Sequence, residues 1–386
     1  MLLWCTGCEI IQLISINTLY LEKKPGKRHN ISETFAIFAQ EAKLHAMKTT
    51  LDTIARRTGF SKSTISRVLN NKAYSSRISR ETAERILDEA KRCGYTPNLV
   101  AKNLRTNQTQ TIGLLVPSLA NPYFAEIASV IIQESRKYGY TAILADTMED
   151  ESTQNTAITN ILARQVDGII IVPCGNDPAY LEQTNGQCVP IVLVDRYYEH
   201  STLPYVVTNN FHGGYMAASL LVRNGHKDIA CIQGPPSAMT NRKRIEGYLA
   251  VLKENHLEDR AVIVGNEFSI QNGYLETKLL LNYERRPTAI FALSNNIGLG
   301  AIKAIREAKL RIPEDISLVS FDNYLYLDFL EPAITRIGQM VDEMGKMAVK
   351  LLNESIANHR EIKSQIELSP EMILRESVAP VIPQDK

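Results

Sequence analysis

The chain lacks a hydrophobic run long enough to cross a membrane, and it lacks a regular cysteine framework. No stretch of about 18 consecutive apolar residues, the minimum for a transmembrane helix, occurs in its 386 residues. Its six cysteines are irregularly spaced, so we expect a reduced, cytoplasmic protein without disulfides. Cys5 and Cys8 form a single CxxC, which without further cysteine or histidine ligands does not predict a zinc site.

Motifs of several enzyme classes are also missing. There is no phosphate-binding GxxxxGK[ST] loop, no GxGxxG after an expected strand and no GxSxG nucleophile turn. The seven histidines are scattered and give no metal triad. We therefore expect no catalytic residues, no metal and no cofactor.

The N-terminal region fits nothing downstream. It begins with an apolar stretch but lacks the basic segment and the small-residue cleavage site of a signal peptide. Residues 1–46 are interpreted as an over-long start or a disordered extension, and an accessory helix over residues 31–45 is the alternative. The length of the chain predicts two or three domains.

Two short helical patterns meet at a turn between residues 50 and 69. Apolar residues recur at the i, i+3, i+4 spacing of one helix face: Leu51, Ile54 and Ala55. Gly59 supplies the backbone freedom that a sharp turn needs, and Ser61 is a suitable N-cap for a second helix. The stretch therefore predicts a helix-turn-helix.

The second helix is expected to bury one stripe and present another. The buried stripe is Ile65, Val68 and Leu69. The outward residues are Lys62, Ser63, Ser66 and Arg67. Their amine, hydroxyl and guanidinium groups suit the edges of bases in the DNA major groove. A third helix capped by Ser79 completes a small core with Ala83, Ile86, Leu87 and Ala90.

Charge is distributed unevenly along the chain. Residues 47–107 contain thirteen Lys or Arg against five Asp or Glu, a net charge of +8. Residues 1–46 carry +1 and the whole chain carries +1, so the part after Asn107 carries −8. This asymmetry indicates a polyanion-binding end joined to a part that does not bind DNA.

After residue 110, apolar runs of strand length alternate with helical patterns. The runs are TIGLLVP, TAILAD, GIIIVP, PIVLVD, DIACIQG, TAIFAL and ISLVSFD. Continuous apolar strands separated by helices predict parallel sheets covered on both faces. About ten such units are too many for one sheet, so two doubly wound lobes are expected.

The segments TLDTIARRTGFSKSTISRVLNN and GYTPNLVAKNLRTNQTQTIGLLVP resemble the head and hinge of the lac-repressor (LacI/GalR) family of bacterial transcription regulators. The resemblance extends from Lys48 to Pro380. It implies a small all-α helix-turn-helix head followed by an α/β core with the periplasmic-binding-protein fold. The implied parts are a head at 47–95, a hinge helix and linker at 96–109, and a core at 110–380. The core would divide into an N-lobe at 110–208 and 340–364 and a C-lobe at 209–339 and 365–380, with crossings near Thr208, Gln339 and Ser364.

The resemblance also implies which residues contact DNA. Base-reading positions would be Lys62, Ser63 and Arg67. Positions near phosphates would be Thr64, Ser66 and Asn70. In the hinge, Leu104 would wedge into the minor groove and kink the operator, with Asn98 and Ala101 at positions of the hinge-helix motif.

Polar and aromatic residues follow the expected strands, where ligands of doubly wound sheets bind. With the resemblance, they predict an effector site between the lobes made of Tyr123, Phe124, Asp195, Arg196, Arg244, Phe268, Asn295 and Asp322. Carboxylates and amides pair with sugar hydroxyls, and aromatic faces cover the C–H side of a pyranose. We expect a sugar-type effector. Because Arg242 and Arg244 lie close together, a sugar acid or sugar phosphate remains an alternative effector. Glu246 is a candidate to neutralise one of the two arginines.

We expect a transcription regulator that represses carbohydrate-metabolism genes and whose operator affinity depends on the effector. Partners would be double-stranded operator DNA, the small molecule and a second copy of the chain, with Ser118 to Ala128 contributing to the homodimer. No heptad pattern follows Ala379, so a tetramer is not expected. The rival interpretation, an exported sugar-binding protein, would need a signal peptide and has no use for a basic head. Induction and corepression remain alternatives.

Overall fold

A computed structural model describes residues 49–69, 78–95, 108–187, 189–358 and 363–381. The predictions for residues 1–46 and for the hinge residues 96–107 lie outside the described residues. The chain divides into two compact units with the boundary between Leu99 and Val100. Of the helices in the described ranges, none is long and apolar enough to span a bilayer.

Three helices build the head: α3 (Leu51–Thr58), α4 (Lys62–Leu69) and α5 (Arg80–Arg92). Their shared core consists of Ile54, Ile65, Val68, Ile86 and Ala90. Each fully buried isoleucine contributes roughly 1.5–3 kcal/mol, so the head has a hydrophobic core of its own. The prediction that Leu87 belongs to this core is wrong, because Ile86 and Ala90 already occupy the inner side of α5 and Leu87 is 47% exposed.

The turn and the caps of the head are those expected. Gly59 has a φ of 78°, in the left-handed region that favours glycine. The hydroxyl of Ser61 accepts a hydrogen bond from the amide of Thr64 at 3.2 Å. Ser79 accepts one from the amide of Thr82 at 3.2 Å. These bonds satisfy amide groups that have no partner inside a helix, and they set where α4 and α5 begin.

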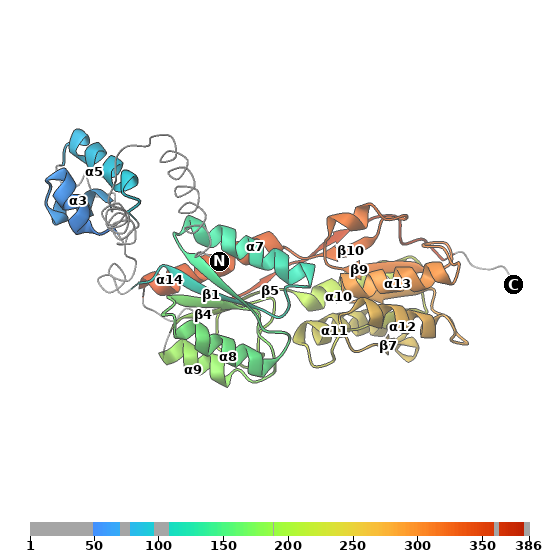
Figure 1. Cartoon of the computed structure of the whole chain (residues 1–386). Coiled ribbons are helices and arrows are strands. Elements are labelled where there is room, and N and C mark those ends of the chain that lie inside the picture. Colours follow the sequence, from blue (N-terminus) through green and yellow to red (C-terminus); the bar gives the residue numbers. More distant parts are fainter. Residues whose placement is uncertain (1–48, 70–77, 96–107, 188, 359–362, 382–386) are drawn as a thin grey trace, which may run out of the picture. The chain divides into compact units, whose positions relative to one another are not determined.

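The first lobe is a six-stranded parallel sheet between two layers of helices (Figure 1). Its strands are β1 (Thr111–Val116), β2 (Thr141–Asp146), β3 (Gly168–Ile171), β4 (Ile191–Val194), β5 (Tyr205–Thr208) and β11 (Gln365–Leu368). Its helices are α7 (Pro122–Lys137), α8 (Glu151–Leu162), α9 (Ala179–Gln187) and α14 (Val341–Asn358). The strand order is β11-β5-β4-β3-β1-β2. Helices α7 and α14 pack on one face and α8 and α9 on the other.

The second lobe repeats this plan. Its strands are β6 (Ile229–Ile232), β7 (Val262–Val264), β8 (Ala289–Ala292), β9 (Ser317–Phe321), β10 (Thr335–Gly338) and β12 (Glu371–Ile373). Its helices are α10 (Asn210–Arg223), α11 (Met239–Glu254), α12 (Ile270–Leu280) and α13 (Asn295–Glu307), with 3-10 turns η2 (Glu258–Arg260) and η3 (Leu325–Asp328). The order is β12-β10-β9-β8-β6-β7, and only β12 runs antiparallel to its neighbour. The seven strands predicted from the apolar runs are confirmed, and so is the two-lobed fold class.

The chain crosses between the sheets three times: between Thr208 and Asn210, between Gly338 and Val341, and between Leu368 and Glu371. The prediction that the second lobe resumes at residue 365 is wrong. Strand β11 pairs in parallel with β5, so it extends the first sheet at its edge before the chain crosses. Its alternation of exposed and buried residues is that of an edge strand, which the run of apolar letters does not reveal.

Helices α10 and α11 approach each other through glycines. A Cβ atom on Gly214 would lie 2.0 Å from the carbonyl oxygen of Arg244, and one on Gly247 would lie 2.1 Å from the carbonyl oxygen of Phe211. Only hydrogen fits at these two positions, because the opposing atoms belong to the backbone. The contact fixes the position of α11, which carries Arg242 and Arg244.

Candidate DNA-binding surface and effector site

The start of α4 is held by a cluster of hydroxyl groups. The Ser61 oxygen lies 2.9 Å from the Ser63 oxygen and 2.8 Å from the Thr64 oxygen. Ser63 is exposed and Thr64 half-buried. Short polar side chains therefore stand at the N-terminal end of the helix, the end that contacts bases in helix-turn-helix proteins.

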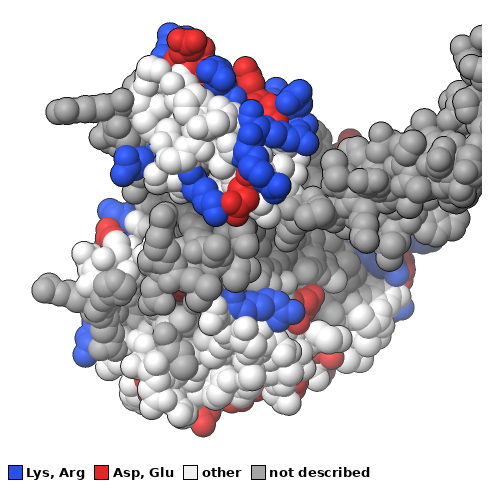
Figure 2. Space-filling model, turned by 60° about the vertical axis from the view of Figure 1, so that its left-hand side comes forward, with Lys and Arg blue, Asp and Glu red and all other residues white. Residues whose placement is uncertain are grey.

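The two cationic residues of α4 have different surroundings. The Lys62 ammonium lies 2.6 Å from a carboxylate oxygen of Asp52 on α3. Arg67 is exposed and makes no hydrogen bond or ion pair with any residue that the structure describes. In the head, which occupies the upper part of Figure 2, Lys and Arg side chains gather along one side with single acidic groups between them. Ser66 is half-buried, and Asn70, Asn98, Ala101 and Leu104 lie outside the described residues.

A cleft of about 870 Å³ opens between the lobes of the core. The first lobe contributes Ser118, Asn121, Glu149, Asn176, Arg196 and Tyr197. The second contributes Ser237, Arg242, Glu267, Phe268, Ser269 and Asn296. These residues follow the carboxyl ends of strands, including β1 and β3 in one lobe and β6 and β8 in the other. The strand order reverses between β1 and β3 in the first sheet and between β6 and β8 in the second. Open α/β sheets bind ligands at such points of reversal.

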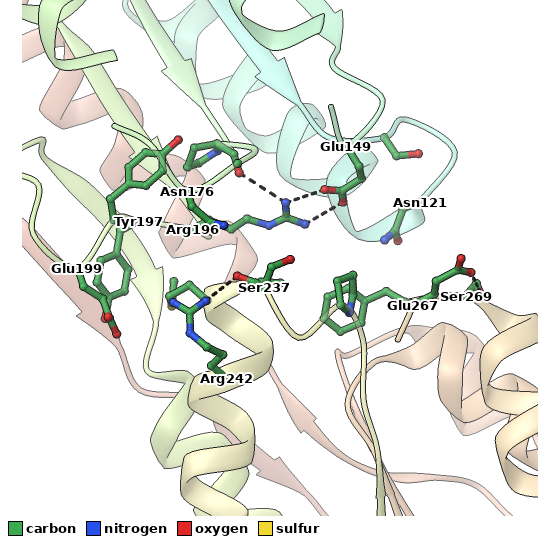
Figure 3. A pocket seen from close by; sticks show the side chains of 18 of the residues that line it. Asn121, Glu149, Asn176, Arg196, Tyr197, Glu199, Ser237, Arg242, Glu267 and Ser269 are labelled. Carbon is green, nitrogen blue, oxygen red and sulfur yellow. Dashed lines mark hydrogen bonds and ion pairs between the residues drawn. The ribbon is translucent and has the colours of Figure 1, made fainter. Parts of the chain in front are cut away.

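Arg196 is clamped by Glu149 at one side of this cleft (Figure 3). Its two terminal nitrogens donate to the two carboxylate oxygens of Glu149 at 2.7 and 2.8 Å. The guanidinium also lies over the ring of Phe124, 5.4 Å from its centroid. Burial lowers the pKa of Arg196, but the hydrogen bonds and charge of Glu149 outweigh it and the pKa lies above its ordinary value. The pair thus presents fixed polar atoms with no net charge.

A buried set of hydrogen bonds joins the lobes beside the cleft. The hydroxyl of Tyr123 lies 2.6 Å from Oδ1 of Asp195 and 2.9 Å from Oε1 of Gln339. The Gln339 oxygen also accepts from the hydroxyl of Thr208 at 2.7 Å, and its nitrogen donates to Asp322 at 2.7 Å. Gln339 therefore connects the first lobe to Asp322, at the end of β9 in the second. Burial raises the pKa of Asp195 and, more strongly, that of Tyr123.

Arg244 is buried, with 4% of its surface exposed. It donates to Oδ1 of Asn210 at 2.8 Å and to the carbonyl of Leu293 at 2.6 Å. Its guanidinium stacks 3.6 Å from the centroid of the Phe321 ring. Burial lowers its pKa, against the opposing charges of Asp322 and Asp195.

The predicted effector residues fall into two groups. Arg196 and Phe268 line the cleft. Buried positions next to it are taken by Tyr123, Phe124, Asp195, Arg244, Asn295 and Asp322. The side-chain nitrogen of Asn295 donates to the Tyr326 hydroxyl, and its backbone N–H donates to Asp322 at 3.2 Å. The side-chain oxygen of Asn295 is buried without a partner among the described residues, so it remains available as an acceptor.

A helix-turn-helix head followed by a two-lobed ligand-binding core defines the class of effector-controlled DNA-binding regulators. Residues 50–98 match the model for bacterial regulatory proteins of the lacI family. Residues 109–373 match the model for periplasmic binding proteins and the sugar binding domain of the LacI family. The chain belongs to the LacI family of bacterial regulatory proteins, as predicted, and is a DNA-binding transcriptional repressor.

Relatives and solved structures agree with this assignment. The chain is 34% identical to the HTH-type transcriptional repressor PurR of Photorhabdus laumondii, over 85% of this chain and 96% of the relative. The lac repressor dimer bound to operator and the anti-inducer ONPF superposes with a TM-score of 0.77 at 27% identity, covering 86% of this chain and 99% of that one. A LacI-family regulator from Enterococcus faecium with bound ribose gives a TM-score of 0.64 at 30% identity, covering 70% and 100%.

Several residues of the cleft and its surroundings are not predicted from the sequence. The sequence predicts Gln339 only as a crossing point, because strand β10 before it (Thr335–Gly338) is not among the predicted strands. Glu149 and Glu267 follow β2 and β7, whose ends carry no conspicuous motif. Glu246, the candidate to neutralise an arginine, instead pairs with Lys243 at 3.0 Å.

Proposed function

We propose that this repressor controls carbohydrate-metabolism genes as a homodimer, with its operator affinity set by a sugar-type effector bound between the lobes. The observation that carries the proposal is the cleft of about 870 Å³, lined from both lobes by amides, hydroxyls, charged groups and the ring of Phe268. Amide and carboxylate groups pair with vicinal hydroxyls, and an aromatic ring covers the apolar side of a sugar. The structure of a related regulator with bound ribose supports the same class of ligand.

The charges of the cleft favour a neutral effector over a sugar acid or phosphate. Arg196 of the cleft is already neutralised by Glu149. Of the two arginines that suggest an anion, Arg242 and Arg244, the second is buried against its own partners. Arg242 lines the cleft and donates to the carbonyl of Ser237 at 2.6 Å. Glu267 also lines the cleft and opposes a bound anion, whereas Glu199 is paired with Lys243 at 3.0 Å.

An effector that contacts both lobes shifts the equilibrium of their relative angle by its differential affinity for the two arrangements. The three crossings are short, and the buried bonds of Gln339 join the lobes beside them. A change of angle therefore rearranges these bonds. Transmission to the operator would pass through the hinge of residues 96–109.

A homodimer is supported by the lac repressor dimer among the similar structures. In the proposed surface between Ser118 and Ala128, Leu119 is 40% exposed, and Leu144 of the edge strand β2 is 36% exposed. The two leucines line one shallow depression together with Ala125 and Ile132. A second copy would bury these side chains.

The DNA-binding assignment is tested by Arg67→Ala in a gel-shift assay against the duplex that the wild type selects from genomic fragments. Loss of a base contact by Arg67 costs about 1–3 kcal/mol of discrimination, so selective binding should fall by roughly 5- to 150-fold. Arg92→Ala removes the same charge from the exposed end of α5 and should change selectivity little. Equal behaviour of the two variants would contradict the recognition role of α4.

The effector class is tested by thermal shift of the whole protein against neutral sugars, sugar acids, sugar phosphates and nucleobases. A neutral sugar should raise the melting temperature, and the same sugar should change operator affinity in the gel shift. Phe268→Ala should abolish both responses, whereas Phe211→Ala, an exposed phenylalanine outside the cleft, should retain them. A response to a charged ligand or a nucleobase alone would refute the neutral-sugar assignment.

A further inference from the structure

The residue that contacts Lys62 is an acid on the other helix of the helix-turn-helix. Asp52 lies in the first turn of α3, and its carboxylate oxygen is 2.6 Å from the Lys62 ammonium. The two side chains are 57% and 61% exposed, so the pair stands at the surface and not in the core of the head. A carboxylate on a surface that approaches phosphates weakens DNA binding. We therefore expect Asp52 to have a role that offsets this unfavourable effect.

The stereochemistry of the ammonium group supplies one. A lysine ammonium has three N–H donors on a flexible stem of four methylenes. With one donor held by Asp52, two remain, and guanine presents two acceptors, O6 and N7, on its major-groove edge. The ion pair restricts the rotation of the lysine and turns its free donors away from Asp52.

The pair also changes how Lys62 treats the backbone of DNA. An unpaired ammonium is attracted electrostatically to any phosphate, whatever the base sequence. A lysine already neutralised by a carboxylate gains less from a phosphate, since its charge is compensated before contact. Arg67 has no such partner among the described residues, so the two cations of α4 are not equivalent.

We propose that Asp52 is a positioning residue for base recognition: it orients Lys62 toward a guanine and suppresses the pairing of Lys62 with phosphates. This inference rests on the proposed role of α4 as the recognition helix. Asp52 itself contacts no base. Its effect appears as a base preference at one position of each half-site.

The experiment compares full-length wild type, Asp52→Asn, Lys62→Ala and the double variant. Each is titrated with the duplex selected by the wild type, with single-base substitutions of that duplex and with random DNA. Glu81→Gln is the matched control, because Glu81 is a first-turn carboxylate of α5 in the same head and makes no ion pair within the described residues. It reproduces the change in charge and in helix-end electrostatics without touching Lys62.

Asp52→Asn should lower the preference for guanine at one position by roughly two- to fivefold, the range of an exposed ion pair, and raise affinity for random DNA. Lys62→Ala should lose the preference at the same position, and adding Asp52→Asn should then leave the base profile unchanged. Glu81→Gln should keep the wild-type profile.

Three results would overturn the inference alone: an Asp52→Asn profile equal to that of Glu81→Gln, an effect of Asp52→Asn that persists without Lys62, or full base preference in Lys62→Ala. The second would mean that Asp52 touches a base directly, as a carboxylate accepting from a cytosine amine. If the wild type selects no duplex at all, the proposed function fails and this inference fails with it.

Discussion

Replacing Gln339 by leucine should both destabilise the core and disturb its response to ligands. The side chain is 7% exposed and joins Thr208, Tyr123 and Asp322. Leucine has a similar size but neither donor nor acceptor. The Asp322 carboxylate then loses a hydrogen bond worth about 1.5–3 kcal/mol, and the Thr208 hydroxyl loses one worth about 1 kcal/mol. We expect the free energy of unfolding to fall by about 2–4 kcal/mol.

Urea unfolding followed by circular dichroism measures this loss. Gln154→Leu is the matched control, since Gln154 is equally buried and accepts from the amide of Cys174 at 2.7 Å within the first lobe. It should lose about 1–3 kcal/mol for the unpaired amide. Only Gln339→Leu should also change operator affinity, by about fivefold or more, because Gln339 joins the two lobes and Gln154 does not. A stability loss below about 0.5 kcal/mol, or operator affinity equal in the two variants, would refute the role assigned to this amide.

Further predictions concern packing and pH. Gly214→Ala should destabilise the protein by about 1–3 kcal/mol or more, because its Cβ would lie 2.0 Å from a backbone oxygen; Gly186→Ala, in helix α9 with open space around it, should stabilise by roughly 0.5–1 kcal/mol. Urea titrations measure both changes in stability, and equal unfolding midpoints of the two variants would contradict the close contact of α10 with α11. Burial lowers the pKa of His226, so its contribution to stability is complete above its unfolded pKa of about 6.5 and is lost as the pH falls through the folded value. His226→Gln should therefore show a smaller loss of melting temperature than the wild type between pH 7 and pH 5, and parallel curves would contradict this. Arg336 and Arg375 lower the pKa of Asp328, so Asp328→Asn should flatten the stability curve at still lower pH, where the wild type loses this contribution.

The sequence was sufficient for the elements whose signals are local. The turn at Gly59, the cap at Ser61 and the seven apolar strands each depend on a few consecutive residues, and all are present. The short strands β5, β7, β10, β11 and β12 were not predicted. Strands β5 and β7 are very short apolar runs, and β10, β11 and β12 mix polar with apolar residues. Strand β11 pairs with β5, which precedes it by about 160 residues.

The sequence predicts where the site lies, but not which of its residues line the cleft and which are buried beside it. Strand ends mark which side of each sheet faces the cleft, and Arg196 follows the predicted strand β4, whereas Phe268 was named from the family resemblance; both line the cleft. Whether a residue at a strand end reaches the cleft or turns into the interior depends on contacts with residues distant in the chain, which local patterns do not contain. Asp195 and Arg196 are neighbours in sequence, yet the first is buried with Tyr123 and the second pairs with Glu149 at the cleft.

The three crossings bear on how the polypeptide matures during translation. The head has its own core and is complete once residue 95 has been synthesised, whereas the first sheet waits for β11 and the second for β12. Since domains fold as units with the N-terminal one first, nascent chains display a finished DNA-binding tip long before the sensor exists. Ribosomes that stop early would therefore release fragments that carry the folded head without the two lobes that regulate it.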